Sequence, residues 1–255
     1  MTILFKNAEI IDVGTSNVVT DGKYISYIGK EPYDGKCDRV INCKNKFLLP
    51  GLYNCHTHAA MTLFRGYGED MPLMEWLNNR IFPAEELLTD HAVYTASKFA
   101  IAEMLRGGIV SFSDMYFFCD ETARAVSETG IKANLSRAVT SFDENIDMNT
   151  DVRFAEAKSL FERWNNSSDG RIKIDMAIHA EYTNVEKACR AVADYASEKP
   201  TGLHIHLSET ENEHRECIER HGKTPARFFA DCGCFDVPVN AAHCVWVDDS
   251  DIDLM

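Results

Sequence analysis

The pattern of hydrophobic and polar positions changes near residue 50 of the chain. Before that point, apolar side chains come in short bursts that alternate with polar residues, at Ile3–Phe5, Glu9–Val13, Tyr24–Ile28 and Arg39–Ile41. Short alternating runs separated by turn residues such as Asp21-Gly22 are typical of β-strands. The pattern therefore predicts a small β domain over residues 1–49.

From Pro50-Gly51 onward, strand-like apolar runs alternate with segments of helical spacing. The helical segments carry recognisable caps and lie at Thr89–Gly108, Asp120–Gly130 and Asn184–Lys199. The runs that we expect to be strands are Leu52–Cys55, Ile109–Phe112, Ile131–Leu135, Ile172–Ile178, Leu203–Leu207 and Pro238–Ala242. Residues 50–255 are thus predicted to contain six βα units in a row.

A repeated strand–helix–strand order requires a parallel sheet with right-handed crossovers, either an open doubly wound sheet or a (β/α)8 barrel. Polar side chains lie at or just beyond the carboxyl ends of the predicted strands, namely His56 and His58, Asp114, Arg137, His179, His206 and His243. In a barrel, active-site residues converge from many strand ends, whereas an open sheet concentrates them at one switch point. The expected fold class is therefore α/β, with a TIM-type barrel of which about six βα units are present.

Composition and charge narrow the function classes. The chain has 255 residues, of which 45% are hydrophobic, enough for one large core and a small appendage. A formal net charge of -14 disfavours nucleic acid and anionic membranes as partners. No apolar run approaches the roughly 20 residues that cross a bilayer, and Met1 is not followed by a signal sequence. We therefore expect a cytoplasmic location and reduced thiols at the nine cysteines.

The histidines carry the candidate chemistry, since the sequence contains no glycine-rich phosphate-binding loop. His56 and His58 are two residues apart, so both imidazoles point to one side of an extended backbone, within reach of one cation. Alone, such a pair also fits loop histidines that are bonded to the backbone. On the fifth predicted strand, His206 lies nearer the carboxyl end and is the preferred third ligand, whereas His204 is expected to be a hydrogen-bonded core residue beneath it.

Two further residues follow strands that we expect to end at this site. Glu209 comes three residues after His206, where a carboxylate can reach a metal-held water and act as a general base. His243 ends the sixth predicted strand and is placed to orient the same water or to take up charge.

These motifs resemble those of the amidohydrolase superfamily, over nearly the whole chain. The matching segments are Pro50–His58 (PGLYNCHTH), Met61–Gly66 (MTLFRG), His206–Glu209 (HLSE) and Ala242–Cys244 (AHC). More narrowly, they are similar to the branch that contains 5'-methylthioadenosine/S-adenosylhomocysteine deaminases and the related chlorohydrolases.

The resemblance implies a (β/α)8 barrel with a small β-sandwich, of which residues 1–49 would be the N-terminal part and residues 50–255 the barrel. It also implies one divalent ion, usually zinc with iron or manganese as alternatives, held by His56, His58, His206 and an aspartate after strand eight. Glu209 and His243 would handle protons. Relatives with two metals use a lysine that ends strand four, but Lys173 lies near the amino end of that strand, which favours one ion.

The implied reaction is hydrolytic deamination of an adenine nucleoside, with 5'-methylthioadenosine, S-adenosylhomocysteine or adenosine as the small-molecule partner. The ion would lower the pKa of its water towards about 7, and Glu209 would pass a proton to a ring nitrogen before ammonia leaves. Guanine or cytosine deamination and chloride displacement from a triazine use the same site and stay open as alternatives. Outside the enzymes, the rival is an inactive barrel that only binds ligand.

Several positions match residues that contact substrate in the deaminase branch: Trp76, Glu85, Arg137, Arg153 and His179. Glu85 would bind ribose hydroxyls, and the others would contact the nucleoside or its amino-acid tail. The alternative is structural, with Trp76 as a packing aromatic, Glu85 as a capping charge and Arg153 as a solvated residue. Glu181 stands where the family commonly has proline, which leaves the shape of this loop open.

Six βα units do not close an eight-stranded barrel. The fourth ligand, expected by resemblance to be an aspartate, would lie beyond residue 255, so we expect residues 1–255 alone to be inactive. The aspartates after the last predicted strand are expected to be helix-capping charges instead: Asp248, Asp249, Asp251 and Asp253. The sequence leaves the oligomeric state open, including a homo-oligomer.

Overall fold

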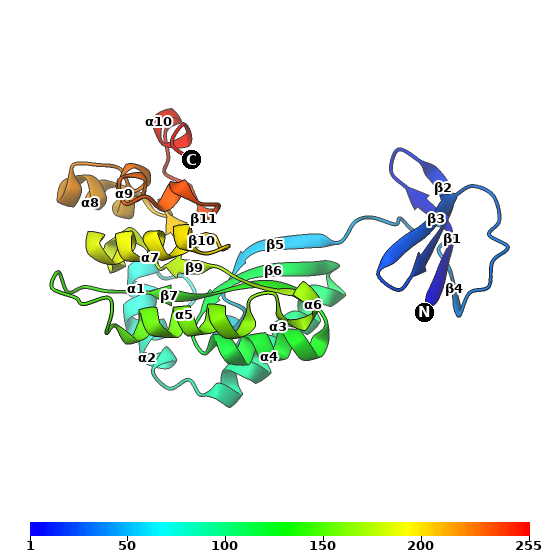
Figure 1. Cartoon of the computed structure of the whole chain (residues 1–255), viewed down its shortest axis with the longest axis horizontal. Coiled ribbons are helices and arrows are strands. Elements are labelled where there is room, and N and C mark those ends of the chain that lie inside the picture. The colour runs from blue at the N-terminus through cyan, green and yellow to red at the C-terminus, as the bar shows by residue number, and fades with distance from the viewer. The chain divides into compact units, whose positions relative to one another are not determined.

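The computed structural model describes residues 1–255. These residues form two compact units, Met1–Gly51 and Leu52–Met255 (Figure 1). The strands are β1 (Thr2–Ile10), β2 (Gly14–Asp21), β3 (Tyr24–Gly29), β4 (Arg39–Asn42), β5 (Leu52–Thr57), β6 (Ile109–Tyr116), β7 (Lys132–Val139), β8 (Ile172–Ile174), β9 (Met176–Ile178), β10 (Leu203–Leu207) and β11 (Val239–His243). The α-helices are α1 (Leu73–Trp76), α2 (Phe82–Glu85), α3 (Asp90–Arg106), α4 (Cys119–Thr129), α5 (Val152–Trp164), α6 (Ser167–Gly170), α7 (Glu186–Glu198), α8 (Glu211–His221), α9 (Pro225–Asp231) and α10 (Asp249–Ile252). The 3-10-helical turns are η1 (Ala59–Phe64), η3 (Glu181–Thr183) and η4 (Cys234–Asp236), and η2 (Leu77–Ile81) is a π-helical turn. No helix is long and apolar enough to cross a membrane.

The first unit is one four-stranded sheet with the order β3-β2-β1-β4. Strand β1 pairs antiparallel with β2 and parallel with β4. Leu4 and Ala8 of β1 and the consecutive Val18 and Val19 of β2 are buried and form its apolar core. The short alternating runs in the sequence therefore form the β-strands that they predict.

The second unit is built on a parallel sheet with the order β5-β6-β7-β9-β10-β11, and β8 also pairs with β7. Helices α3, α4, α5 and α7 pack along this sheet (Figure 1). Their apolar residues, such as Ile101, Val126, Leu160 and Val192, are buried against strand residues. Strand order follows chain order, which is the arrangement of successive βα units in a barrel.

The two end strands of this sheet lie close to each other. The side chain of Asn240 on β11 donates a hydrogen bond of 2.7 Å to the carbonyl oxygen of Cys55 on β5. The sheet is therefore curled into a nearly closed barrel, and the predicted α/β barrel class is confirmed.

Most predicted elements are found within a few residues of their expected bounds, with one clear difference. The expected strand Ile172–Ile178 is interrupted at Asp175, so that β8 and β9 are separate. Asp175 is mostly buried and accepts hydrogen bonds from the Asn134 side chain and, at 3.1 Å, from the Gly202 backbone N–H. A polar side chain bonded between neighbouring strands replaces ladder bonds at this point.

Candidate active site

A cavity of about 400 Å³ opens at the carboxyl ends of the parallel strands. Strands β5, β6, β9, β10 and β11 contribute residues to its wall, or the loops that directly follow them do. The remaining wall comes from Met61 of η1, Ala138 of β7 and the helical run between residues 73 and 85. Because carboxyl ends of parallel strands meet at one side of a barrel, residues distant in sequence converge here.

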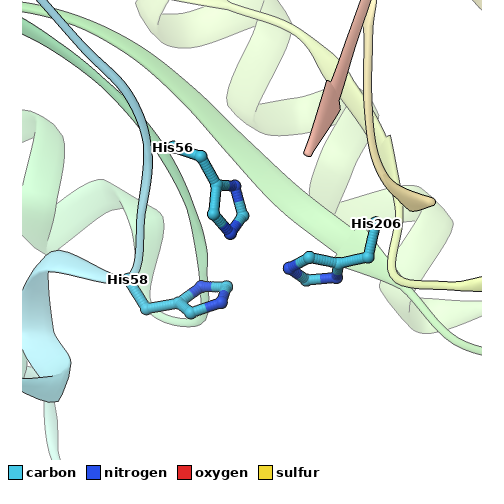
Figure 2. Close-up of side chains that lie close together, drawn as sticks. All are labelled: His56, His58 and His206. Atoms are coloured by element: carbon cyan, nitrogen blue, oxygen red, sulfur yellow. The ribbon is translucent and has the colours of Figure 1, made fainter. Parts of the chain in front are cut away.

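Three histidines point into a common space in this cavity (Figure 2). One ring nitrogen from each of His56, His58 and His206 lies within 4.8 Å of the others. The Nδ1 atoms are engaged elsewhere: with the Met115 carbonyl for His58, the His179 carbonyl at 2.7 Å for His206, and His204 for His56. The Nε2 atoms therefore remain as ligand atoms.

Burial keeps these three imidazoles neutral. It lowers the pKa of His56 to about 4, with the neighbouring His58 and His243 adding to the effect. Burial likewise lowers the pKa of His58 and, more strongly, that of His206. A neutral imidazole keeps the lone pair that a metal requires, and three imidazoles suit zinc and similar divalent ions. The donor set therefore fits one divalent metal ion.

Local structure holds His56 and His58 in place at the end of β5. Strand β5 ends at Thr57, and alternate side chains of an extended chain share a face, which brings His56 and His58 together. Directly after them, the Ala59 backbone N–H donates a 2.6 Å hydrogen bond to the buried Asp114 carboxylate on β6. Burial raises the pKa of Asp114 to about 7, and the bond from Ala59 opposes that rise.

Glu209 and His243 face each other at the cavity wall. Glu209 Oε2 lies 3.6 Å from His243 Nε2, and both side chains are roughly three-quarters buried. His243 adopts a left-handed backbone conformation with a φ of 75°, which is unusual for a residue with a side chain and is typical of functional sites. The pair couples a proton acceptor to a second titratable group beside the histidine cluster.

The backbone at Ser208 and Glu209 is held by hydrogen bonds to two other segments. Ser208 is also left-handed, with a φ of 48°. The buried Glu213 carboxylate accepts hydrogen bonds from the backbone N–H groups of Ser208, at 3.0 Å, and of Glu209, at 2.8 Å. The Ser208 carbonyl accepts from Val245 and Trp246, which follow His243. These bonds join the segment that carries Glu209 to the segment that carries His243.

The helical run that forms the apolar wall contains a wide π-helical turn, η2. The Phe82 backbone N–H donates to the Leu77 carbonyl, a bond to the fifth preceding residue. Pro83 follows, and its missing N–H could not continue an α-helical ladder. A π turn takes more residues than an α turn, so it rotates the later residues and brings Glu85 onto the side of Leu73 and Leu77.

Glu85 reaches the cavity in this way and meets β6. The Tyr116 hydroxyl donates a 2.7 Å hydrogen bond to Oε1 of Glu85. Burial raises the pKa of Glu85, and the bond from Tyr116 opposes the rise. A carboxylate with one oxygen so occupied keeps its other oxygen available to a ligand hydroxyl.

Residues 47–255 match the model of the amidohydrolase family. The chain belongs to this family. A 5-methylthioadenosine/S-adenosylhomocysteine deaminase of Thermoanaerobacter pseudethanolicus is 39% identical over 100% of the chain, and one of Dictyoglomus turgidum is 43% identical. A 5'-deoxyadenosine deaminase of Methanosarcina barkeri is 40% identical over 99% of the chain. The chain spans about 60% of the length of these curated relatives.

Solved structures agree with the family assignment. A zinc-bound adenosine deaminase from Xanthomonas campestris superposes with a TM-score of 0.89 at 27% identity, over 99% of this chain and 60% of that one. An atrazine chlorohydrolase from Arthrobacter aurescens, complexed with zinc, has a TM-score of 0.85 at 21% identity, over 99% of this chain and 63% of that one. The second likeness shows the fold alone.

Within this amidohydrolase, the predicted substrate contacts fall into two groups. Trp76, Glu85 and His179 line the cavity. Arg137 lies outside the lining, where it pairs with Glu156 at 2.8 Å, and Arg153 is half exposed beside the helix start. A role in substrate binding stays a prediction for all five residues.

The loop around Glu181 takes a form that the sequence left open. Glu181 begins the turn η3 and its carboxylate is almost fully buried. Arg220 pairs with it at 2.7 Å and His221 at 2.8 Å, so η3 is tied to α8. The hydrogen bond between His221 and Glu181 joins residues forty positions apart, so the helical pattern of the sequence does not reveal it.

Several residues of the site were not singled out from the sequence as cavity or positioning residues. Tyr116 and Tyr182 line the cavity, and Glu213 clamps the Glu209 backbone. Only Glu213 had a detectable signal, because Thr210-x-x-Glu213 is a helix-capping pattern. The predicted capping role of the aspartates after β11 is confirmed for Asp248, whose side chain accepts the Asp251 backbone N–H at 3.0 Å.

Proposed function

We propose that the protein carrying this chain is a metal-dependent hydrolytic deaminase of an adenine nucleoside. The substrate would be 5'-methylthioadenosine, S-adenosylhomocysteine or adenosine, and the products the inosine analogue and ammonia. Deaminases of this kind are the curated relatives with 38–48% identity to the chain. The deaminase relatives support the reaction class, and the cavity supports the site.

One observation carries the proposal: Glu209 and His243 stand beside the three-histidine cluster in a single cavity. A hydrolytic deaminase needs an activated water, an acceptor for its proton and a donor to the substrate ring. The cluster and the two neighbouring side chains supply groups suited to each of these tasks.

Each protein group has a distinct task in the proposed reaction. When bound by His56, His58 and His206, a divalent ion supplies a Lewis acid that makes water nucleophilic at neutral pH. A carboxylate oxygen of Glu209 takes a proton from the water and delivers it to a ring nitrogen of the substrate. At the same time, the water oxygen bonds to the amine-bearing carbon of the ring. His243 steadies the charge on Glu209 during this transfer. The remaining hydrogen of the added water passes to the amino group, which leaves as ammonia, and the ring becomes a lactam.

The cavity walls suit a flat base joined to a sugar. Its volume of about 400 Å³ lies in the range of small-molecule sites, and most of its lining is apolar. Phe82, Phe117 and Trp76 supply aromatic surface for a purine ring. Glu85 is the carboxylate at the end of the helical wall, and we assign it to the ribose hydroxyls.

Further parts of the proposal follow from the family and the sequence. We assign zinc as the metal, in line with the zinc in the Xanthomonas campestris adenosine deaminase. An aspartate that is not in this chain would complete the ligand set. We also propose that residues 1–49 belong to a β-sandwich domain and residues 50–255 to the barrel, that the protein is cytoplasmic, and that it does not bind nucleic acid or membranes.

An ammonia-release assay of the full-length protein tests the substrate class. The panel comprises adenosine, 5'-methylthioadenosine, S-adenosylhomocysteine, guanine, cytosine and a chlorotriazine, with chloride release followed for the last. We expect ammonia from at least one adenine nucleoside and no chloride. If only guanine, cytosine or the triazine were turned over, the proposed substrate class would be wrong. If the purified protein held no stoichiometric metal, the proposal of a metal-dependent hydrolase would be wrong.

A further inference from the structure

Another buried histidine contacts the metal-binding cluster without belonging to it. His204 lies on β10 and is 1% exposed. Its Nε2 atom is 2.8 Å from Nδ1 of His56, and the two rings meet edge to face. His58 and His206 bond to backbone carbonyls through their Nδ1 atoms, so His56 is the one ligand whose partner is another side chain.

The direction of this hydrogen bond follows from the neighbouring groups. A neutral His56 that offers Nε2 to a metal carries its hydrogen on Nδ1 and must donate it to His204. Independently, the Asn240 amide nitrogen, which can only donate, lies 3.4 Å from the same Nε2 atom of His204. Both neighbours require His204 Nε2 to be an acceptor.

The hydrogen of His204 must then sit on Nδ1, and the structure provides a partner for it. His204 Nδ1 is 3.3 Å from the Ser136 hydroxyl oxygen. The Ser136 hydroxyl in turn donates a 2.9 Å bond to the Asp114 backbone carbonyl, which can only accept. Each hydrogen bond from His56 through His204 and Ser136 to Asp114 therefore has a defined donor and acceptor. The direction of this series of hydrogen bonds is set at both of its ends.

We propose that His204 is a positioning residue for the metal ligand His56, which it holds as the tautomer that presents Nε2 to the ion. The bond fixes the ring orientation of His56 and raises its basicity as a ligand. Partners of this kind are typically worth about 10- to 100-fold in metal affinity. The inference rests on the metal site of the proposed function but does not depend on the deamination reaction.

Two amide substitutions separate the positioning role from simple core filling. In His204→Gln, the amide oxygen can reach the place of Nε2 and accept the His56 hydrogen. In His204→Asn, the shorter amide reaches only the place of Nδ1, so the bond to Ser136 can persist while the bond to His56 is lost. Both variants place a polar amide in the same buried site, which makes them a matched pair.

The readout is zinc affinity of the full-length protein, measured by competition with a chromophoric chelator. We expect His204→Gln to bind zinc within a few-fold of the wild type and His204→Asn to bind about 10- to 100-fold more weakly. Equal affinities for the two variants would overturn the inference and leave the deaminase proposal intact. A wild-type protein that does not bind zinc would overturn both.

A second measurement determines the tautomer of His204 in the wild-type protein itself. Two-bond proton–nitrogen NMR spectra of the zinc-loaded protein, labelled with 15N-histidine, distinguish imidazole tautomers, and the missing signal in His204→Gln assigns the ring. We expect His204 to carry its hydrogen on Nδ1. A hydrogen on Nε2 would reverse the direction of these hydrogen bonds and overturn the inference.

Discussion

The hydroxyl of Tyr116 donates a 2.7 Å hydrogen bond to Glu85, which joins the carboxyl end of β6 to the helical wall of the cavity. The bond opposes the rise that burial causes in the pKa of Glu85 and helps to keep this carboxylate ionised. If Glu85 accepts substrate hydroxyls, Tyr116 decides which of its oxygens is free to do so.

Tyr116→Phe is therefore expected to weaken substrate binding. The loss of one hydrogen bond to a charged group costs roughly 1.5 kcal/mol, or about tenfold in kcat/KM, and we expect most of it in KM. Steady-state kinetics with adenosine and a 2',3'-dideoxy analogue measure this, and the analogue should be less affected. Tyr94→Phe, which removes a surface bond to Glu128, is the control. An unchanged KM would contradict the assignment of Glu85.

Glu209→Gln is expected to retain the metal and lose turnover. The amide cannot take a proton from water, and loss of general acid–base catalysis costs about 10²- to 10⁴-fold. Metal content by atomic spectroscopy and kcat by ammonia release are measured on the same preparation. Glu211→Gln, two residues later on the exposed side of α8, should behave as the wild type. A variant of Glu209 with near-normal kcat would remove this residue from the proposed role.

Deletion of Asn79 tests the π turn. Asn79 is exposed within η2, and its removal should return the run to α-helical geometry, which turns Glu85 away from the cavity. We expect kcat/KM to fall by about tenfold or more, as for loss of a charged contact to substrate. Asn79→Ala, which keeps the residue count, should show little change. The idea fails if the deletion variant binds substrate as tightly as Asn79→Ala does.

The stability of the protein is expected to depend on pH through Asp175. Burial raises the pKa of Asp175 above its ordinary value of 3.8, against hydrogen bonds from Asn134 and Gly202 that lower it. Below pH 3.8 both folded and unfolded forms hold the proton; as pH rises, the unfolded form ionises first, so stability is lost until the folded form has ionised too.

The comparison is the free energy of unfolding of wild type and Asp175→Asn, measured in urea between pH 4 and pH 8. The asparagine cannot ionise, and a flipped Asn134 amide can accept its hydrogen, so this variant lacks the contribution of residue 175. We expect the stability difference to shift in favour of Asp175→Asn as pH rises. A difference that stays constant over this range would show that the pKa of Asp175 is not raised.

The local pattern of the sequence was sufficient to predict the barrel and the pair of histidines at the end of β5. Apolar periodicity and helix caps are properties of neighbouring residues, so they indicate strands and helices without knowledge of the rest of the chain. The spacing of His56 and His58 works in the same way, because alternate residues of any extended strand share a side. His206 and Glu209 could be added because the ends of parallel strands meet at one face.

Only the tertiary structure decided how these residues are held. The partner of His56 is His204, 148 positions later, and Glu181 is paired with α8 across forty positions. Such contacts depend on the register between strands and on helix packing, which local patterns do not encode. The π turn before Glu85 and the break at Asp175 are likewise small departures from regular geometry. The free-energy difference between the irregular and the regular backbone geometry is set by the residues that pack around each position. The sequence near that position therefore does not reveal the irregularity.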